Sequence, residues 1–504
     1  MSSGISWPID STTGKASSTP VNKSVWIAAL DALSSPESDA LAAKIRGERR
    51  WRQKYVQLVH EVVVLQAGAA EDECLKSCRA GLDALNEALT FTQDGSVIGS
   101  AKEAMSKAGL EKFVTETKAG SGAAPKEPFA MRTPMGHAEP VVSGEALKGQ
   151  AKAWSDYGCI EPSASSALST VASMSDVSSL VKNKVFVLLG ATSSLGPFAP
   201  LAKLGAKIAC VARKGKKLEK LVAEAAETPA TLLLPTRGGV AGADLIADAP
   251  AIADWILTLP ARGEQIVLGC YAYLDGEKHV RASVAMDLIA EKVVAGKKGS
   301  ALAYLVSPAT SHAATDEAAE DSGRRYEETP MWHGLFRKTF GSFAKREFST
   351  AEGTGIKVIN GLSSIQGPNY ALAKTSQQWR AMVAKADGAV VSANHAPAAR
   401  TESMVGYATI AAALEGMQSF PPLVAYDPGT ACDMMAAILL WDLTDSKSLA
   451  SPKNPGNHPT DLLAENACHG GIWRCAYDME SVNTASFLFG RFQPSYTPAG
   501  SLSI

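Results

Sequence analysis

The chain has 504 residues, of which 46% are hydrophobic and 20% are charged, and its mean hydropathy is close to zero. These values are typical of a globular protein with two or three structural regions. The net charge of -2 argues against a general affinity for nucleic acid, and no apolar run is long enough to predict a membrane span. Eight scattered cysteines without CxxC spacing predict no disulfide framework and no metal site. Reduced thiols favour a cytoplasmic location, although an organelle location stays open.

Composition divides the chain into four segments. Residues 1–23 are polar and lack the apolar core of a secretory signal, so we interpret them as a disordered tail. A helical region follows at 24–117. Residues 118–181 are rich in Gly, Ala, Ser and Pro, which predicts a linker with one or two short ordered pieces. Residues 182–504 form the last segment, in which a different pattern begins.

The region 24–117 carries apolar residues at helical spacing. The first stripe begins after a helix start at Ser35-Pro36-Glu37 and continues to Gly68, which predicts one long helix. A second stripe runs from Leu75 to Leu89, and a weaker pattern covers 101–117. These patterns predict an α-helical N-terminal region.

From residue 182 onward, short aliphatic runs alternate with helical patterns. The runs are VFVLLG at 185–190, KIACVA at 207–212, ATLLLP at 230–235, EQIVLG at 264–269, ALAYLV at 301–306, IKVING at 356–361 and AVVSAN at 389–394. Apolar strands separated by helices are typical of a parallel sheet covered on both faces. The pattern therefore predicts an α/β domain with a doubly wound, mostly parallel sheet.

The first of these strands leads into a glycine-containing loop, and a helix follows at once. The loop residues expected to contact a ligand are Gly190, Thr192, Ser193, Ser194, Leu195 and Gly196. Glycine here lets the backbone approach a pyrophosphate, and the helix N-terminus offers free N–H groups to the phosphates. The sequence therefore predicts a Rossmann-type dinucleotide-binding site.

The second strand ends at Arg213 and Lys214. An NAD site carries an acid at this position to hold the ribose 2′-hydroxyl, whereas arginine and lysine suit a 2′-phosphate. We therefore expect NADP(H) as the cofactor; the competing interpretation is a solvated basic helix start.

At this point the chain resembles the short-chain dehydrogenase/reductase superfamily, over about residues 182–480. That family's TGxxxGxG fingerprint aligns with 189–196, where Leu189 replaces the threonine and Ser194 replaces the middle glycine. Later stretches are also similar to family landmarks: 390–404 to a strand and loop, 427–445 to a helix near the C-terminal end, and 470–478 to the last strand. The resemblance implies that Thr401 closes over the cofactor and that the protein is a homo-oligomer.

The resemblance also implies a catalytic serine, tyrosine and lysine. In the family the tyrosine exchanges the carbonyl proton, the lysine four residues on lowers its pKa and holds the nicotinamide ribose, and the serine holds the substrate oxygen. The matching residues are Tyr370, Lys374 and either Ser363 or Ser364. Tyrosine and lysine at this spacing share one helix face.

A second alignment stays open. The family's Asn-Asn-Ala-Gly is replaced by Gly269-Cys270-Tyr271-Ala272, and an extra strand and helix occupy 301–350. If ALAYLVSP at 301–308 is the catalytic strand, Ser307 is the serine and Lys338 the lysine, but Gly334 stands where a tyrosine is needed. We favour the first alignment, because its serine, tyrosine, lysine and following strand occur in the expected order.

These observations predict an NADP(H)-dependent oxidoreductase that transfers hydride between nicotinamide and a carbonyl or secondary alcohol. The sequence does not identify the substrate. An aromatic helix face suggests that the substrate is apolar, but the same face also suits packing or dimerisation; its residues are Trp332, Phe336, Phe340 and Phe343. The alternative is a non-catalytic Rossmann-fold scaffold or regulator that acts through its N-terminal helices. The altered fingerprint favours this alternative, and Tyr370 with Lys374 favours the enzyme.

Overall fold

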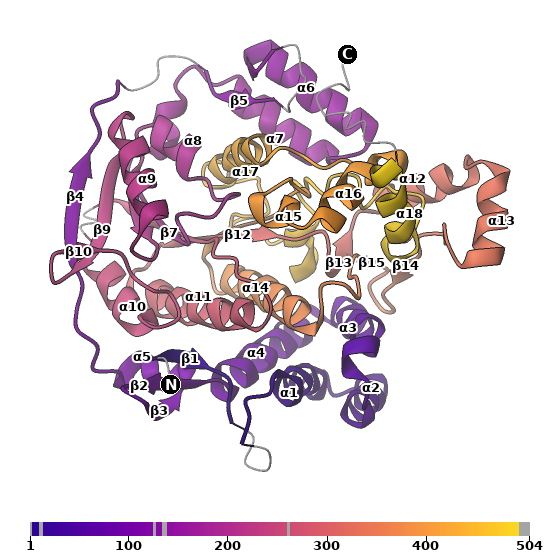
Figure 1. Ribbon diagram of the computed structural model, residues 1–504, viewed down its shortest axis with the longest axis horizontal. Helices are drawn as coiled ribbons and strands as arrows, with labels where there is room; N and C mark the ends of the chain where they lie inside the picture. The colour runs from indigo at the N-terminus through magenta and orange to yellow at the C-terminus, as the bar shows by residue number, and fades with distance from the viewer. Residues whose placement is uncertain (1–2, 10–13, 124–127, 134–138, 260–262, 493–504) are drawn as a thin grey trace.

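The computed structural model describes residues 3–9, 14–123, 128–133, 139–259 and 263–492 (Figure 1). At its centre lies an eight-stranded, mostly parallel sheet with the order β10-β9-β8-β7-β11-β12-β16, in which β4 also pairs with β9. The six parallel strands are β7 (Lys184–Leu189), β8 (Lys207–Val211), β9 (Thr231–Arg237), β11 (Gln265–Cys270), β12 (Ala301–Val306) and β16 (Val390–His395). The two antiparallel strands are β4 (Val114–Ala119) and β10 (Val240–Ala241).

The parallel strands lie in the order 3-2-1-4-5-6 when they are numbered along the chain, which is the standard doubly wound order. The predicted α/β class is therefore confirmed, and the point where the strand order reverses falls between β7 and β11. The prediction for the run IKVING at 356–361 is wrong, because this segment is not part of the central sheet. β15 (Lys357–Asn360) pairs antiparallel with β13 (Ser311–Ala314) and β14 (Phe348–Thr350) outside the central sheet. The stretch 470–478 contains turns and no strand.

Side chains that alternate along β7 enter two different cores. Val185, Val187 and Leu189 enter one core, and Phe186 and Leu188 enter the other. The first core contains residues of α10 (Ala249–Thr258), α11 (Glu277–Gly296) and α14 (Pro368–Ala386). The second contains residues of α8 (Phe198–Lys203), α9 (Lys216–Ala226) and α17 (Pro428–Asp442). Helices therefore cover both faces of the sheet, as Figure 1 shows. This explains why the central strands are apolar throughout, since the side chains on both of their faces are buried.

Four helices form the N-terminal helical region: α1 (Ser18–Asp31), α2 (Pro36–Gly47), α3 (Trp51–Gly68) and α4 (Glu71–Ala88). The prediction of one long helix ending at Gly68 is wrong, because the chain is extended at Glu48 and the stripe is divided between α2 and α3. Gly47 has low helix propensity and lies directly before this break. The third predicted helix is also shorter, since α5 covers only Ala101–Lys107 and the chain then continues into β4.

The N-terminal helices pack against α14. The rings of Trp26 and Trp379 meet edge to face with centroids 5.3 Å apart. At Gly81 an added Cβ would lie 2.4 Å from the Trp379 ring, so only glycine lets α4 approach this closely. The N-terminal helices therefore support α14 and share one hydrophobic core with it.

The described parts of the predicted tail and of the predicted linker contain more helices and strands than expected. In the predicted tail, β1 (Gly4–Ser6) pairs with β2 (Thr90–Gln93), which pairs in turn with β3 (Ser96–Ser100). The predicted linker contains β5 (Ala130–Arg132), β6 (Val141–Ser143), α6 (Gly144–Tyr157) and α7 (Pro162–Ala172). The buried face of α7, which consists largely of small side chains, packs against α17. The Ala- and Ser-rich composition that predicted a linker therefore allows two helices to pack closely.

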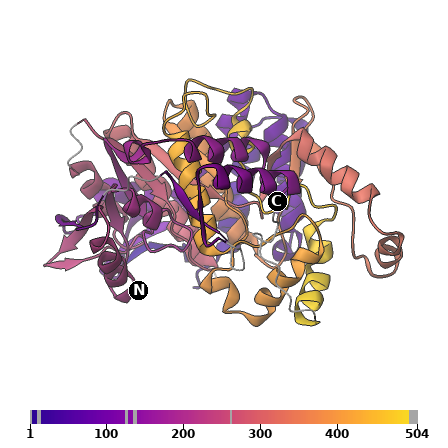
Figure 2. The same ribbon diagram turned by 90° about the horizontal axis from the view of Figure 1, so that it is seen from above.

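The connection between β12 and α14 is long and contains its own elements. After β13 come α12 (Asp316–Glu327) and α13 (Met331–Phe340), and α13 projects from the body in both views (Figures 1 and 2). The chain after β16 forms α15 (Glu402–Val405), α16 (Ala408–Gly416), α17 and α18 (Met479–Phe492). Among the described helices, none combines the length and apolarity needed to cross a membrane.

Candidate functional site

The loop after β7 lies at the point where the strand order reverses. Gly190 begins it with a φ of +93°, in the left-handed region that favours glycine. An added Cβ at Gly190 would lie 2.6 Å from the backbone of Ala272, in the loop after β11. The two loops therefore meet closely, and Gly190 is required for this contact. Ligands of open α/β sheets bind in the crevice at such a position.

The rest of this loop is held by its own backbone. The Ser193 N–H donates to the Gly190 carbonyl at 2.9 Å, and the Gly196 N–H donates to the Ser193 carbonyl at 3.1 Å. Ser194 is exposed, whereas Thr192, Ser193 and Leu195 are half-buried.

The helix after this loop differs from the predicted phosphate-binding helix. α8 has only six residues, and Pro197 and Pro200, at and near its start, lack N–H groups. The contribution expected from a helix N-terminus is therefore reduced. In the 190–196 loop, the N–H groups of Gly190, Ala191, Ser193 and Gly196 donate to carbonyls of the protein itself.

Arg213 and Lys214 directly follow β8, next to the same end of the sheet. Both side chains are exposed, and no hydrogen bond or ion pair is formed by either within the described part of the chain. Gly242 covers the backbone here, because a Cβ at this glycine would lie 2.6 Å from the Lys214 nitrogen. The two cations are thus available to a ligand phosphate.

Thr401 lies in the loop after β16, immediately before α15, and it is buried. Its backbone N–H donates to the Ala399 carbonyl at 2.8 Å. Thr401 therefore lies beyond the carboxyl end of a central strand.

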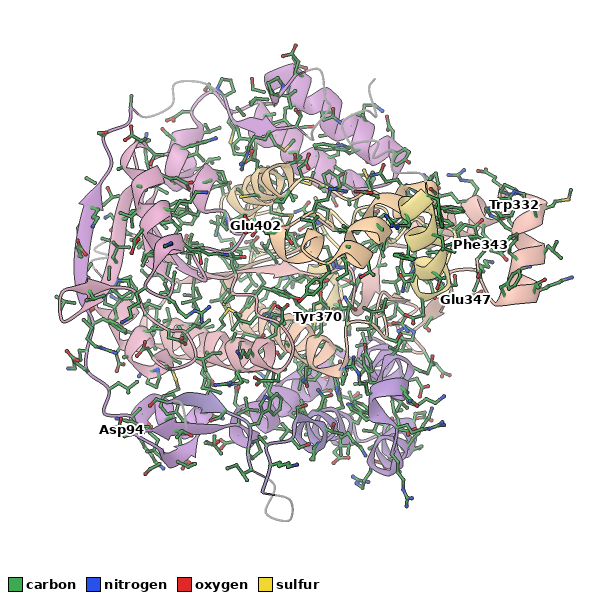
Figure 3. All side chains as sticks on the ribbon, in the orientation of Figure 1. Asp94, Trp332, Phe343, Glu347, Tyr370 and Glu402 are labelled. Carbon is green, nitrogen blue, oxygen red and sulfur yellow. The ribbon has the colours of Figure 1, made fainter. Side chains whose placement is uncertain are left out.

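Tyr370 contacts Ser307. The Tyr370 hydroxyl donates to Ser307 Oγ at 2.6 Å across 63 residues of sequence. Ser307 directly follows β12, and Tyr370 lies in the first turn of α14, which packs against β12 and β16. The structure thus combines the serine of the second alignment with the tyrosine and lysine of the first (Figure 3 labels Tyr370).

Ser363 and Ser364 take part in different contacts. The Ser363 carbonyl accepts a hydrogen bond from the Tyr55 hydroxyl at 2.6 Å. Ser364 Oγ donates to the Glu480 carboxylate. Both serines fix the loop before α14 to α3 and α18, and neither forms a hydrogen bond with Tyr370. Sequence reasoning chose them because β15 was assigned to the central sheet, whereas β12 holds that place.

Lys374 lies one turn after Tyr370 on α14. Its Nζ donates to the Leu305 carbonyl at 3.3 Å and to Gln377 Oε1 at 3.4 Å, so it faces the carboxyl end of β12. Burial lowers the pKa of Lys374 to about 8. Burial raises the pKa of Tyr370, and its hydrogen bond to Ser307 opposes this rise. The tyrosine is therefore protonated at neutral pH.

His279 is a neighbour that the sequence reasoning missed. It lies at the start of α11, and neither ring nitrogen has a hydrogen-bond partner among the described residues. Its ring centroid is 4.7 Å from that of Tyr273 and 6.1 Å from that of Tyr370. Burial and the charge of Lys374 both lower the pKa of His279, so the ring is neutral and can accept and donate one hydrogen bond each. The sequence could have drawn attention to His279, because it follows β11, the strand next to the point where the strand order reverses.

Lys338, the lysine of the second alignment, lies on α13 together with Gly334. This helix has no buried residue, and Trp332 on it lies at the projecting end of the molecule, far from Tyr370 (Figure 3). α14, and not α13, packs against β12 and β16.

A cavity of about 650 Å³ lies elsewhere, where β13, α12 and the loop at 449–457 meet. Its lining includes Asp316, Glu317, Asp461 and Glu465, and no residue of the predicted site. In the described ranges, no cluster of three or more His, Cys, Asp or Glu side chains is arranged to hold a metal ion.

The chain matches no model of a known protein family, and no curated protein matches it. Its class follows from the fold alone: it is an α/β protein with an eight-stranded, mostly parallel mixed sheet and an N-terminal helical region. Arg213, His279 and Ser307 follow the carboxyl ends of the central strands β8, β11 and β12.

Proposed function

We propose that the protein is an NADP(H)-dependent oxidoreductase that interconverts a carbonyl and a secondary alcohol on an apolar substrate. The observation that carries this proposal is the 2.6 Å hydrogen bond between Tyr370 and Ser307, with Lys374 one helical turn away. These are the three residue types that the resemblance to short-chain dehydrogenases/reductases implies. The unpartnered His279 beside Tyr370 is a further polar group that a bound ligand would satisfy.

Each residue has a role in the proposed reduction. Tyr370 Oη gives its proton to the carbonyl oxygen, and Ser307 Oγ holds the same oxygen by a hydrogen bond. Lys374 provides a positive charge one helical turn away, which would stabilise the tyrosinate until solvent returns the proton to Tyr370. When bound, NADPH supplies the hydride that the carbonyl carbon takes up. A protonated Tyr370 suits the role of acid, which favours carbonyl reduction at neutral pH.

The cofactor would be held at the loop after β7. Gly190 permits the close backbone approach that a pyrophosphate needs, and Arg213 and Lys214 suit a 2′-phosphate. The short α8 is a departure from the usual arrangement. It is the observation that favours the second candidate, a non-catalytic α/β scaffold.

Fluorescence titration with NADPH and NADH tests the cofactor part. We expect NADPH to bind more tightly than NADH, and Arg213→Ala to weaken NADPH about tenfold or more without changing NADH, as for the loss of a charge-assisted hydrogen bond. Lys220→Ala, on the exposed side of α9, is the matched control and leaves both affinities unchanged. Binding of neither cofactor would favour the scaffold.

A panel of apolar ketones with NADPH tests the chemical part. Tyr370→Phe should lower turnover about a hundredfold or more, because it removes the proton donor. Tyr273→Phe, at a half-exposed neighbouring tyrosine, is the control and keeps most of the activity. Unchanged turnover in Tyr370→Phe would overturn the assignment.

A further inference from the structure

His279 is a buried histidine whose ring forms no hydrogen bond within the described part of the chain. It lies in the first turn of α11 and is 1% exposed. Other buried histidines use both ring nitrogens in hydrogen bonds: His60, His312 and His469. The His395 ring also lacks such bonds, but it packs on the His312 ring inside the protein. Because buried polar groups of native proteins nearly always have a partner, we expect His279 to bind a group from outside the chain.

His279 adjoins the part of the candidate site that reaches solvent. Its ring lies beside those of Tyr273 and Tyr370, with centroids 4.7 and 6.1 Å away. Tyr273 is 46% exposed, and Tyr370, Ser307 and Lys374 are each half-buried. The helices of His279 and Tyr370, α11 and α14, pack side by side (Figure 1). One small molecule held by Tyr370 and Ser307 can therefore also contact the His279 ring.

The neutral state of the His279 ring limits the kind of group that it binds. Burial and the charge of Lys374 both lower the pKa of His279, so at neutral pH one ring nitrogen donates and the other accepts. A carbonyl or a carboxylate only accepts and an ammonium only donates, so each of these groups suits only one of the two nitrogens. A hydroxyl both donates and accepts, so it pairs with whichever nitrogen faces it. A hydroxyl is therefore the group that best matches this ring.

We propose that His279 binds a substrate hydroxyl group on the carbon next to the carbonyl that Tyr370 and Ser307 hold. The neighbouring carbon is chosen because the rings of His279 and Tyr370 lie only 6.1 Å apart. The inference rests on the oxidoreductase function proposed above, and it narrows the substrate class to α-hydroxy ketones that are otherwise apolar. A site that hydrogen-bonds a substrate hydroxyl discriminates against the analogue without it, because the buried protein group is then left unpaired.

Three matched ketones, assayed with NADPH in the wild type and in His279→Leu, test the proposal. Benzoin carries the hydroxyl beside its carbonyl, deoxybenzoin lacks it, and benzil has a second carbonyl in its place. We expect His279→Leu to lower kcat/KM for benzoin about tenfold or more, mainly through KM, as for one hydrogen bond left unmade in a buried site. The values for deoxybenzoin and benzil should stay near those of the wild type. Comparing each ketone with itself removes the differences in their intrinsic reactivity.

Two further variants separate binding from a structural role. His279→Leu should fold with at least the thermal stability of the wild type, because the side chain that it removes has no partner in the described chain. His279→Gln keeps a donor and an acceptor, so it should retain part of the kcat/KM for benzoin. His333→Leu, on the projecting helix α13, is the matched control and should leave all three ketones unchanged.

Other outcomes would overturn the proposal. Equal losses for benzoin and deoxybenzoin in His279→Leu would show that the ring serves the reaction and not the hydroxyl. An equal loss for benzil would show that it binds an acceptor. Weaker NADPH binding in His279→Leu would make the nicotinamide amide the partner.

A binding measurement distinguishes failure of this proposal from failure of the oxidoreductase function. If none of the ketones is reduced, the oxidoreductase function fails, and calorimetric titration of benzoin and deoxybenzoin into the protein still tests the hydroxyl site. Tighter binding of benzoin that is lost in His279→Leu would support the site. Equal binding of the two ketones, or none, would overturn it.

Discussion

Arg380 and Asp287 form a two-point ion pair, with nitrogen–oxygen distances of 2.5 and 3.0 Å, between α14 and α11. Both side chains are almost buried, at 12% and 6% exposure. Asn86 on α4 donates to the same carboxylate at 2.7 Å. The pair therefore joins the helix of Tyr370 and Lys374 to the helix of His279 and to the N-terminal region. The orientation of the candidate site thus depends on residues that lie outside it.

Removing one partner of this pair should be costly. Asp287→Ala removes both close hydrogen bonds of the buried Arg380 and leaves only the Glu291 carboxylate, 3.7 Å away, so we expect the free energy of unfolding to fall by about 3 kcal/mol. The control is Asp387→Ala, which breaks the exposed pair between Arg79 and Asp387 and should cost about 1 kcal/mol or less. Urea denaturation measures both. Equal losses in the two variants would contradict the structural role given to Asp287.

The choice of catalytic serine can be tested directly. Ser307→Ala removes the hydroxyl that contacts Tyr370, and turnover should fall about a hundredfold. Ser363→Ala keeps the carbonyl that Tyr55 contacts, so turnover should remain near the wild-type value. The assay is the NADPH-dependent reduction described above. Loss of activity in Ser363→Ala alone would restore the first alignment.

Glu161 should make stability depend on acid pH. Burial raises the pKa of its carboxyl, but hydrogen bonds from His469 and Arg474 lower it to about 2, from an ordinary value of 4.5. The unfolded chain therefore binds more protons between these values. The stability from this carboxylate is complete above about pH 4.5 and is lost as the pH falls towards 2.

Comparison of the wild type with Glu161→Gln isolates this effect. The variant should be less stable by about 3–5 kcal/mol at neutral pH, since Arg474 and His469 lose a charged partner. The difference should shrink between about pH 4.5 and 2. Glu145→Gln, at an exposed carboxylate on α6, should show no such convergence. Urea denaturation at several pH values gives the curves, and parallel curves would rule out the assignment.

The two glycines of the predicted fingerprint should respond differently to alanine. Gly190→Ala forces a side chain into the left-handed region and against Ala272, so we expect a loss of stability of about 1–3 kcal/mol or more. At Gly196 the backbone is ordinary and the nearest atom, the Ser193 carbonyl oxygen, is 3.3 Å from the added Cβ. Gly196→Ala should therefore have a small effect. Thermal denaturation compares them, and an equal effect would show that Gly190 is not specially constrained.

The fold class was predictable because its signal is local. Each central strand is a short aliphatic run whose side chains are buried on both faces, so the run itself predicts the strand. α9, α10 and α11 were equally visible from their patterns. The break between α2 and α3 was not, because the same apolar stripe continues through both helices and only their packing separates them.

The sequence by itself determined the parallel sheet and the placement of Tyr370 and Lys374 on one helix face, since both depend on residues a few positions apart. Only the tertiary structure decided that Ser307, and not Ser363, meets Tyr370. That contact depends on β15 leaving the central sheet and on β12 lying beside β16. It also placed His279 beside Tyr370 and left Met331, Leu335 and Phe340 of α13 exposed. Such contacts depend on which distant segments bury each other, and no short stretch of sequence contains that information.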